Sequence, residues 1–197
     1  MSTISVFQSV TLDGVMQGPG RPDEDTRGGF TRGGWGEGYQ DEVSMRIAGQ
    51  QMARKGALLF GRRTYEDLLG HWTGISEANP FVDVLVRTPK YVVSSSASTE
   101  LAYPNSILLA GDPVETVGAL RERQDIPHLM IMGSGQLIRA LHPAGLIDAY
   151  TLFIHPIVLG EGTRMFGEAE RADLTLQHTE PTSTGVIVAQ YTTRSGG

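Results

Sequence analysis

The 197-residue chain contains no cysteine, which excludes disulfides, cysteine nucleophiles and cysteine-ligated metals. It has no apolar stretch long enough to span a bilayer, and its first residues lack the basic region and long apolar run of a signal peptide. The formal net charge is -6 and no basic run interrupts it, which argues against a nucleic-acid-binding surface. The five histidines show no metal-site spacing, and His155, beside a proline, is expected to be structural. We therefore expect a cytoplasmic protein without a metal, a nucleic-acid partner or a membrane partner.

The length and ordinary composition favour one domain over residues 1–197. Strand and helix patterns alternate for most of the chain, and strands alone close it. The expected strands are Ile4–Leu12, Ala57–Phe60, Lys90–Ser96, Ser106–Ala110, Leu129–Met132, Ala149–Leu159 (the longest, broken at Pro156), Leu174–His178 and Val186–Thr193. Helices are expected over Asp41–Lys55, from Thr64, from Asn79-Pro80, from Asp112-Pro113 and after Gly135. This order predicts an α/β fold with a mainly parallel sheet and an antiparallel C-terminal edge.

Two strand–glycine–helix junctions are candidate binding sites. The buried run Leu129–Met132 ends in Gly133-Ser134-Gly135, and a helix start there would aim free N–H groups at a pyrophosphate. The same pattern also suits a strand-to-helix turn without any ligand. The second junction, Gly61-Arg62-Arg63-Thr64, adds two guanidiniums that match phosphate oxygens such as a 2′-phosphate. The alternative is two solvated arginines. Thr64 resembles the cap of the helix that follows.

A glycine-rich segment, Gln17 to Gln40, holds eight glycines with Phe30, Trp35 and Tyr39 set among them. Long loops inside compact domains are mostly functional lids or disordered stretches, and the aromatic residues favour a lid or substrate wall. Trp35 and Tyr39 would then stack on a flat heterocycle. The alternative is a surface loop whose aromatic residues are anchors packed on the core.

Five motifs occur in an order that resembles the dihydrofolate reductase-like superfamily. More closely, they resemble the stand-alone relatives of the C-terminal reductase domain of RibD, the bifunctional riboflavin-biosynthesis deaminase–reductase. The motifs are Leu12-Asp13-Gly14, Leu59 to Glu66, Val92 to Ser96, Ile131 to Gly135 and Ile154 to Gly162. They extend over nearly the whole chain.

This resemblance implies a three-layer dihydrofolate reductase-like fold with helices on both faces, an NADPH site and a homodimer. It implies reduction of a small pyrimidine- or pterin-like heterocycle, as by 5-amino-6-(5-phosphoribosylamino)uracil reductase in riboflavin biosynthesis or by dihydrofolate reductase. The loop after the first strand would close over nicotinamide and substrate. The residues implied to bind the cofactor are Gly61, Arg62, Arg63, Thr64, Ser94, Ser95, Ser96, Gly133, Ser134, Gly135, Gln136, Leu137, Ile138 and Thr163.

Two departures from the family pattern concern the substrate. Pyrimidine reductases typically carry an acidic residue and two adjacent glycines where this chain has Met132-Gly133-Ser134-Gly135. Dihydrofolate reductases place a carboxylate near the position of Met45, whereas the nearest acids here are Asp41 and Glu42.

Reduction needs a proton source, and a carboxylic acid with a raised pKa would serve. Asp13, at the end of the first strand, is the first candidate, although it also suits a turn aspartate that bonds its own backbone. Glu42 and Asp41 are the second candidates, with helix capping the stronger explanation for Asp41. Two other functions stay open: a non-catalytic nucleotide- or ligand-binding module, and an enzyme in which a flavin replaces the nicotinamide.

Overall fold

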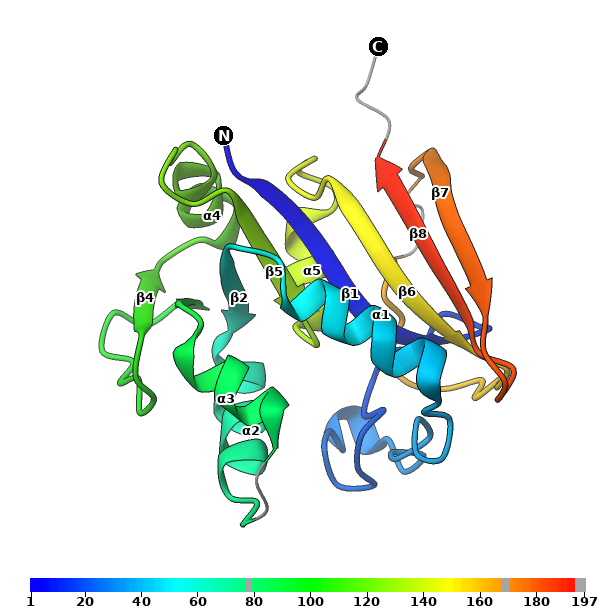
Figure 1. Ribbon diagram of the computed structural model, residues 1–197. Coiled ribbons are helices and arrows are strands. Elements are labelled where there is room, and N and C mark those ends of the chain that lie inside the picture. Colours follow the sequence, from blue (N-terminus) through cyan, green and yellow to red (C-terminus); the bar gives the residue numbers. More distant parts are fainter. Residues whose placement is uncertain (77–78, 168–170, 194–197) are drawn as a thin grey trace. The chain divides into compact units, whose positions relative to one another are not determined.

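A computed structural model describes residues 1–76, 79–167 and 171–193 (Figure 1). The chain forms two compact units. Unit 1 comprises Met1–Ser5 and Arg54–Leu146, and unit 2 comprises Val6–Ala53 and Ile147–Gly197. Strand β1 (Thr3–Thr11) begins in unit 1 and continues into unit 2.

Unit 1 contains a parallel sheet whose strands follow the order β4 (Ser106–Ala110), β3 (Lys90–Ser94), β2 (Ala57–Gly61) and β5 (His128–Met132). Every residue of β3 and β5 is buried, as expected for strands covered on both faces. The prediction of a buried parallel strand over Leu129–Met132 is therefore confirmed.

The helices of unit 1 are α2 (Arg62–Thr73), α3 (Pro80–Arg87), α4 (Pro113–Arg121) and α5 (Gly135–Leu141) (Figure 1). The chain moves from β2 outward to β3 through α2 and α3, then returns from β4 past both strands to β5 through α4. Because such crossovers are right-handed, opposite directions of travel place α4 on the face opposite to α2. Helix α5 contacts α4. The expected helices on both faces are confirmed in this unit.

Unit 2 contains the antiparallel strands β6 (Ala149–His155), β8 (Ile187–Thr193) and β7 (Leu174–Pro181), which complete the strand order β4-β3-β2-β5-β1-β6-β8-β7. Helix α1 (Glu42–Met52) packs Ile47 against Phe153 and Val188 of this sheet. A short 3-10 turn, η1 (Arg27–Gly29), lies in the glycine-rich loop. Within the described ranges, no helix is long and apolar enough to cross a membrane. The predicted antiparallel C-terminal edge is confirmed.

Two local predictions are wrong. Strand β6 ends at His155, so it neither reaches Leu159 nor is the longest strand, since β1 has nine residues and β6 seven. Proline cannot donate to the ladder, and the chain turns at Pro156, where Ile157 N–H donates to the His155 carbonyl. Helix α2 begins at Arg62 with Gly61 as its N-cap, so Thr64 lies inside the first turn and is not the cap.

Candidate functional site

The two glycine junctions of unit 1 meet at the carboxyl ends of β2 and β5. Gly61 N–H donates to Ser134 Oγ at 3.0 Å, and the Thr64 hydroxyl donates to the Gly133 carbonyl at 3.4 Å. Gly133 has φ +67°, and a Cβ there would lie 3.2 Å from Thr64 Cγ2. Glycine therefore suits position 133 both for its backbone conformation and for the close approach of the neighbouring junction.

The first turns of the helices at both junctions lack side-chain caps. The N-cap of α2 is a glycine, and the N-cap of α5 is Ser134, whose hydroxyl is engaged by Gly61 N–H and the Met132 carbonyl. Exposed N–H groups at a helix start attract anions. Arg62 and Arg63 are exposed in the first turn of α2, where Arg62 Nε lies 3.3 Å from the Glu66 carboxylate. This donor set fits the phosphates of a dinucleotide.

The serine-ended strand supplies a third junction in unit 1. Val93 of β3 pairs with Gly61, so the turn after β3 lies at the same sheet edge. Ser94 Oγ contacts Thr99 Oγ1 at 2.7 Å, and Ser96 N–H donates to Ser94 Oγ at 3.3 Å, while Ser95 is exposed.

In α5, the side chains of Leu137 and Ile138 are buried and that of Gln136 is exposed. Leu137 and Ile138 can therefore offer a ligand at this junction only backbone groups.

In unit 2, Asp13 is held as a carboxylate. Its Oδ1 accepts from the Thr11 hydroxyl at 2.6 Å and from Leu159 N–H at 3.2 Å, and its Oδ2 accepts from Gly160 N–H at 2.8 Å. The Thr11 hydroxyl, opposed in part by burial and helped by the two backbone donors, lowers the pKa of Asp13 to about 2. The raised pKa expected for a proton donor at Asp13 is therefore wrong, because these contacts stabilise the ionised form.

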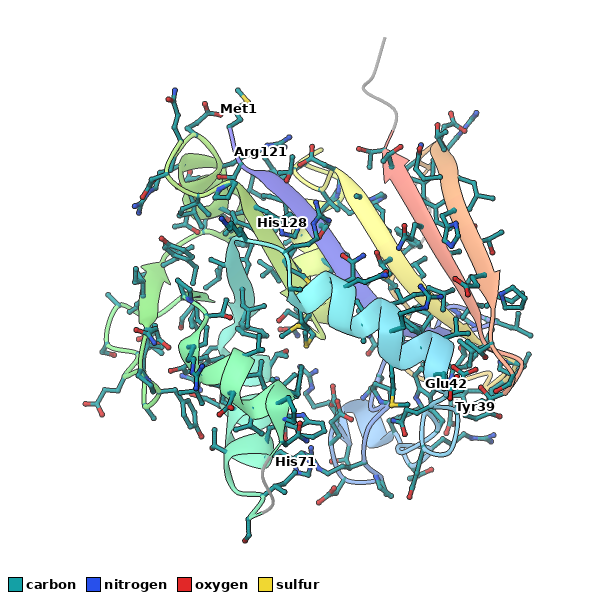
Figure 2. The ribbon with its side chains drawn as sticks, viewed as in Figure 1. Met1, Tyr39, Glu42, His71, Arg121 and His128 are labelled. Carbon is teal, nitrogen blue, oxygen red and sulfur yellow. The ribbon has the colours of Figure 1, made fainter. Side chains whose placement is uncertain are left out.

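The other two acids lie at the start of α1. Asp41 caps the helix: its carboxylate accepts from Ser44 N–H at 2.8 Å and from Ser183 N–H at 2.7 Å, and these donors lower its pKa to about 2. The predicted capping role of Asp41 is confirmed. Glu42 is exposed in the first turn of α1 (Figure 2).

Trp35 and Tyr39 are anchors of the loop. Trp35 is 8% exposed, and its indole N–H donates to the Gln17 carbonyl at 2.7 Å. The Trp35 and Tyr39 rings both meet the buried His155 ring edge to face, with centroids 5.1 and 5.2 Å away. Of the two expectations for these aromatic residues, the structure supports anchoring, and Trp35 has no free face on which a heterocycle could stack.

Thr163, an expected cofactor-binding residue, makes two hydrogen bonds within unit 2. Thr163 donates through its N–H at 2.9 Å and its hydroxyl at 3.0 Å to Gln17 Oε1. Gln17 is buried and carries the most consequential contacts of the loop, yet its sequence neighbourhood contains no motif that would have singled it out. The only feature of the sequence that could have pointed to Gln17 is its position at the start of the glycine-rich segment.

Comparison with known proteins gives matches in sequence and in structure. The sequence model of the RibD C-terminal domain family matches residues 2–188. The uncharacterized protein YyaP of Bacillus subtilis (strain 168) is 30% identical over 140 residues, which are 68% of this chain and 72% of that protein.

Solved structures with the same fold include a putative riboflavin biosynthesis protein from Shewanella sp. PV-4. Its TM-score is 0.68 at 22% identity, with 98% of this chain and 99% of that chain covered. Dihydrofolate reductase from Enterococcus faecalis, complexed with NADP(H), gives a TM-score of 0.63 at 14% identity, with coverages of 98% and 97%. The dihydrofolate reductase-like fold predicted from the sequence is confirmed.

Proposed function

The chain belongs to the RibD C-terminal domain family, and we propose that it is an NADPH-dependent reductase of a small heterocyclic substrate. One observation carries the proposal: the junctions at Gly61 and Gly133 are joined through Gly61 N–H and Ser134 Oγ at the carboxyl ends of adjacent parallel strands. Ligands of open α/β sheets bind at this edge.

The proposed cofactor contacts follow from the donor set. The first turn of α2, with Arg62 and Arg63, holds phosphate oxygens, and the guanidiniums favour NADPH over NADH through the 2′-phosphate. Backbone groups from Gly133 to Ile138 would hold the pyrophosphate and ribose, and the turn at Ser94 to Ser96 would bind beside the adenosine. When bound, NADPH supplies a hydride, and the protein orients it and excludes competing reactions.

For the substrate, we propose a pyrimidine- or pterin-like ring with a polarised C=N or C=O bond. Because Asp13 is held ionised, Glu42 is the carboxyl group of unit 2 that we propose as the proton donor, with water as the alternative. We further propose a homodimer in the cytoplasm, and light scattering of the purified protein tests its mass.

The first experiment is a titration of the purified protein with NADPH and NADH, followed by thermal shift. A ligand that binds only the folded state at a hundredfold excess over Kd raises stability by about 2.7 kcal/mol. We expect stabilisation by NADPH at lower concentration than by NADH, and loss of this preference in Arg62→Ala/Arg63→Ala. Arg87→Ala is the matched control, because Arg87 is exposed at the far end of α3.

Three outcomes separate the functions. NADPH binding followed by its oxidation with a screened pterin or pyrimidine supports the reductase. Binding without oxidation by any of them favours the non-catalytic module. A yellow protein that binds neither nicotinamide cofactor would indicate a flavin and refute the proposal.

A further inference from the structure

One buried side chain, Gln17, joins two segments of unit 2. Its Oε1 accepts two hydrogen bonds from Thr163, at 2.9 and 3.0 Å. Its Nε2 donates to the Arg27 carbonyl at 3.0 Å and to the carbonyl and carboxylate oxygens of Asp25, both at 3.2 Å. Only 5% of Gln17 is exposed. Its amide therefore uses both its donor and its acceptor capacity inside the protein, and few other side chains could replace it.

The glycine-rich loop folds back on itself beside Gln17. Gly34 N–H donates to the Gly18 carbonyl at 2.7 Å, and Gly36 N–H donates to the Pro19 carbonyl at 2.9 Å. The Trp35 indole donates to the Gln17 carbonyl. Residues 18–36 thus form a closed loop whose two ends lie together.

The segment after β6 runs along the start of this loop. Met16 N–H donates to the Thr163 carbonyl and Met165 N–H to the Gly14 carbonyl, both at 2.9 Å, and Val15 pairs with Arg164 as an isolated bridge. The hydrogen bonds between the Gln17 side chain and Thr163 continue this short ladder to the first residue before the loop.

A cavity of about 230 Å³ lies among Gln17, Phe30, Gly162 and their neighbours. It is smaller than pockets that hold a whole drug-sized ligand, which measure roughly 300–1,000 Å³. The loop forms one wall of the cavity and the segment after β6 forms the other. Because Gln17 joins the two segments, the width of the cavity depends on Gln17.

We infer that Gln17 is a positioning residue for the reductase proposed above, on which this inference rests. It holds the loop of residues 18–36 and the segment 159–165 in one arrangement, so the loop is a fixed wall for the substrate instead of a free lid. Its effect on turnover acts through the loop, because every hydrogen bond of its amide is made within the protein.

The test is Gln17→Glu, which keeps the size of the side chain. The carboxylate still accepts from Thr163 but no longer donates to Asp25 and Arg27, and it faces the Asp25 carboxylate. We expect trypsin to cleave after Arg27 and Arg32 at least roughly tenfold faster than in the wild type, since each lost buried hydrogen bond favours local opening. We expect kcat/KM for the heterocycle to fall by a similar factor while Kd for NADPH stays within about twofold.

Gln8→Glu is the matched control. Gln8 is a second buried glutamine of unit 2, 3% exposed, and its Nε2 donates to the Ser9 carbonyl in β1 instead of to a loop residue. A buried carboxylate there lowers stability without opening the loop. Gln17→Glu should therefore exceed Gln8→Glu in loop cleavage and in loss of turnover, even where the two variants melt at the same temperature.

Two results would overturn the inference separately from the proposed function. Unchanged cleavage in Gln17→Glu would show that this side chain does not hold the loop. Faster cleavage with unchanged turnover would show that the order of the loop is not needed for the reaction. Absence of NADPH-dependent turnover in the wild type would instead refute the proposed function, and the role of Gln17 in turnover with it.

Discussion

Because His155 is buried, we predict that the protein loses stability in mild acid. The residue is 5% exposed and packs against the rings of Trp35 and Tyr39, and its Nδ1 is buried without a hydrogen-bond partner among the residues that the structure describes. Burial lowers the pKa of His155 to about 4 from its ordinary value of 6.5. In that interval the unfolded chain binds a proton that the folded protein does not, so stability falls as pH falls from 6.5 and the loss is complete below 4.

The magnitude follows from the two pKa values. Each pKa unit corresponds to about 1.4 kcal/mol, so the full effect is about 3 kcal/mol, and about 2 kcal/mol of it is present at pH 5. For a chain of this length, the loss of about 2 kcal/mol at pH 5 lowers Tm by roughly 4–8 °C. Asp13 and Asp41, whose pKa is lowered to about 2, contribute only in stronger acid.

The assay is urea unfolding at pH 8 and pH 5 for the wild type and for His155→Leu. The variant removes the titrating group, and the loss of two edge-to-face contacts is offset in part by removal of an unpaired buried nitrogen. We expect the stability difference between the two pH values to shrink by about 2 kcal/mol in the variant. An equal difference in both proteins would refute the burial of a neutral His155, and with it the anchoring of the loop aromatics on this ring.

Three further predictions concern single side chains. Ser134→Ala leaves Gly61 N–H without its acceptor, so we expect a loss of about 1 kcal/mol in urea unfolding and several-fold weaker NADPH binding by titration. Lys90→Met removes a fully buried ammonium that donates to three carbonyls near the end of α3, and we expect a loss of about 3 kcal/mol by chemical unfolding with the fold retained by circular dichroism. Asp13→Asn should lower stability at pH 7 but not at pH 2, because the folded pKa is lowered and the benefit of the carboxylate disappears as pH falls through it; full retention of the penalty at pH 2 would contradict this.

The elements that the sequence predicted well are those whose signals are local. The caps Asp41, Asn79 and Asp112 stand immediately before their helices, and each accepts hydrogen bonds from the first turn as predicted. The continuous apolar run Leu129–Met132 correctly predicted a strand covered on both faces. Such a strand shows no alternation of apolar and polar residues, because both of its faces are buried.

The properties that the sequence did not predict depend on donors brought in by the fold. Asp13 lies 146 positions before Leu159, and its charge state is set by that residue's N–H together with Gly160 N–H and a nearby hydroxyl. The same distance separates Gln17 from Thr163. No local pattern shows which backbone N–H group will meet a given side chain, so neither the charge state of Asp13 nor the role of Gln17 could be predicted from the sequence.

The ionised state of Asp13 limits how the proposed reduction could proceed. A carboxylate whose pKa is about 2 carries almost no proton at neutral pH, so it can hold the loops but cannot supply the proton that balances hydride transfer. Asp41 is committed to the α1 cap and shares that property. His155 is neutral, buried and packed against the Trp35 ring, so it is no better suited to donate the proton. The proposed reductase therefore requires a proton from Glu42 or from water, and a substrate whose reducible bond is already polarised demands less of either. This favours a ring with an intrinsically electrophilic C=N or C=O over one that needs a strong acid beside it.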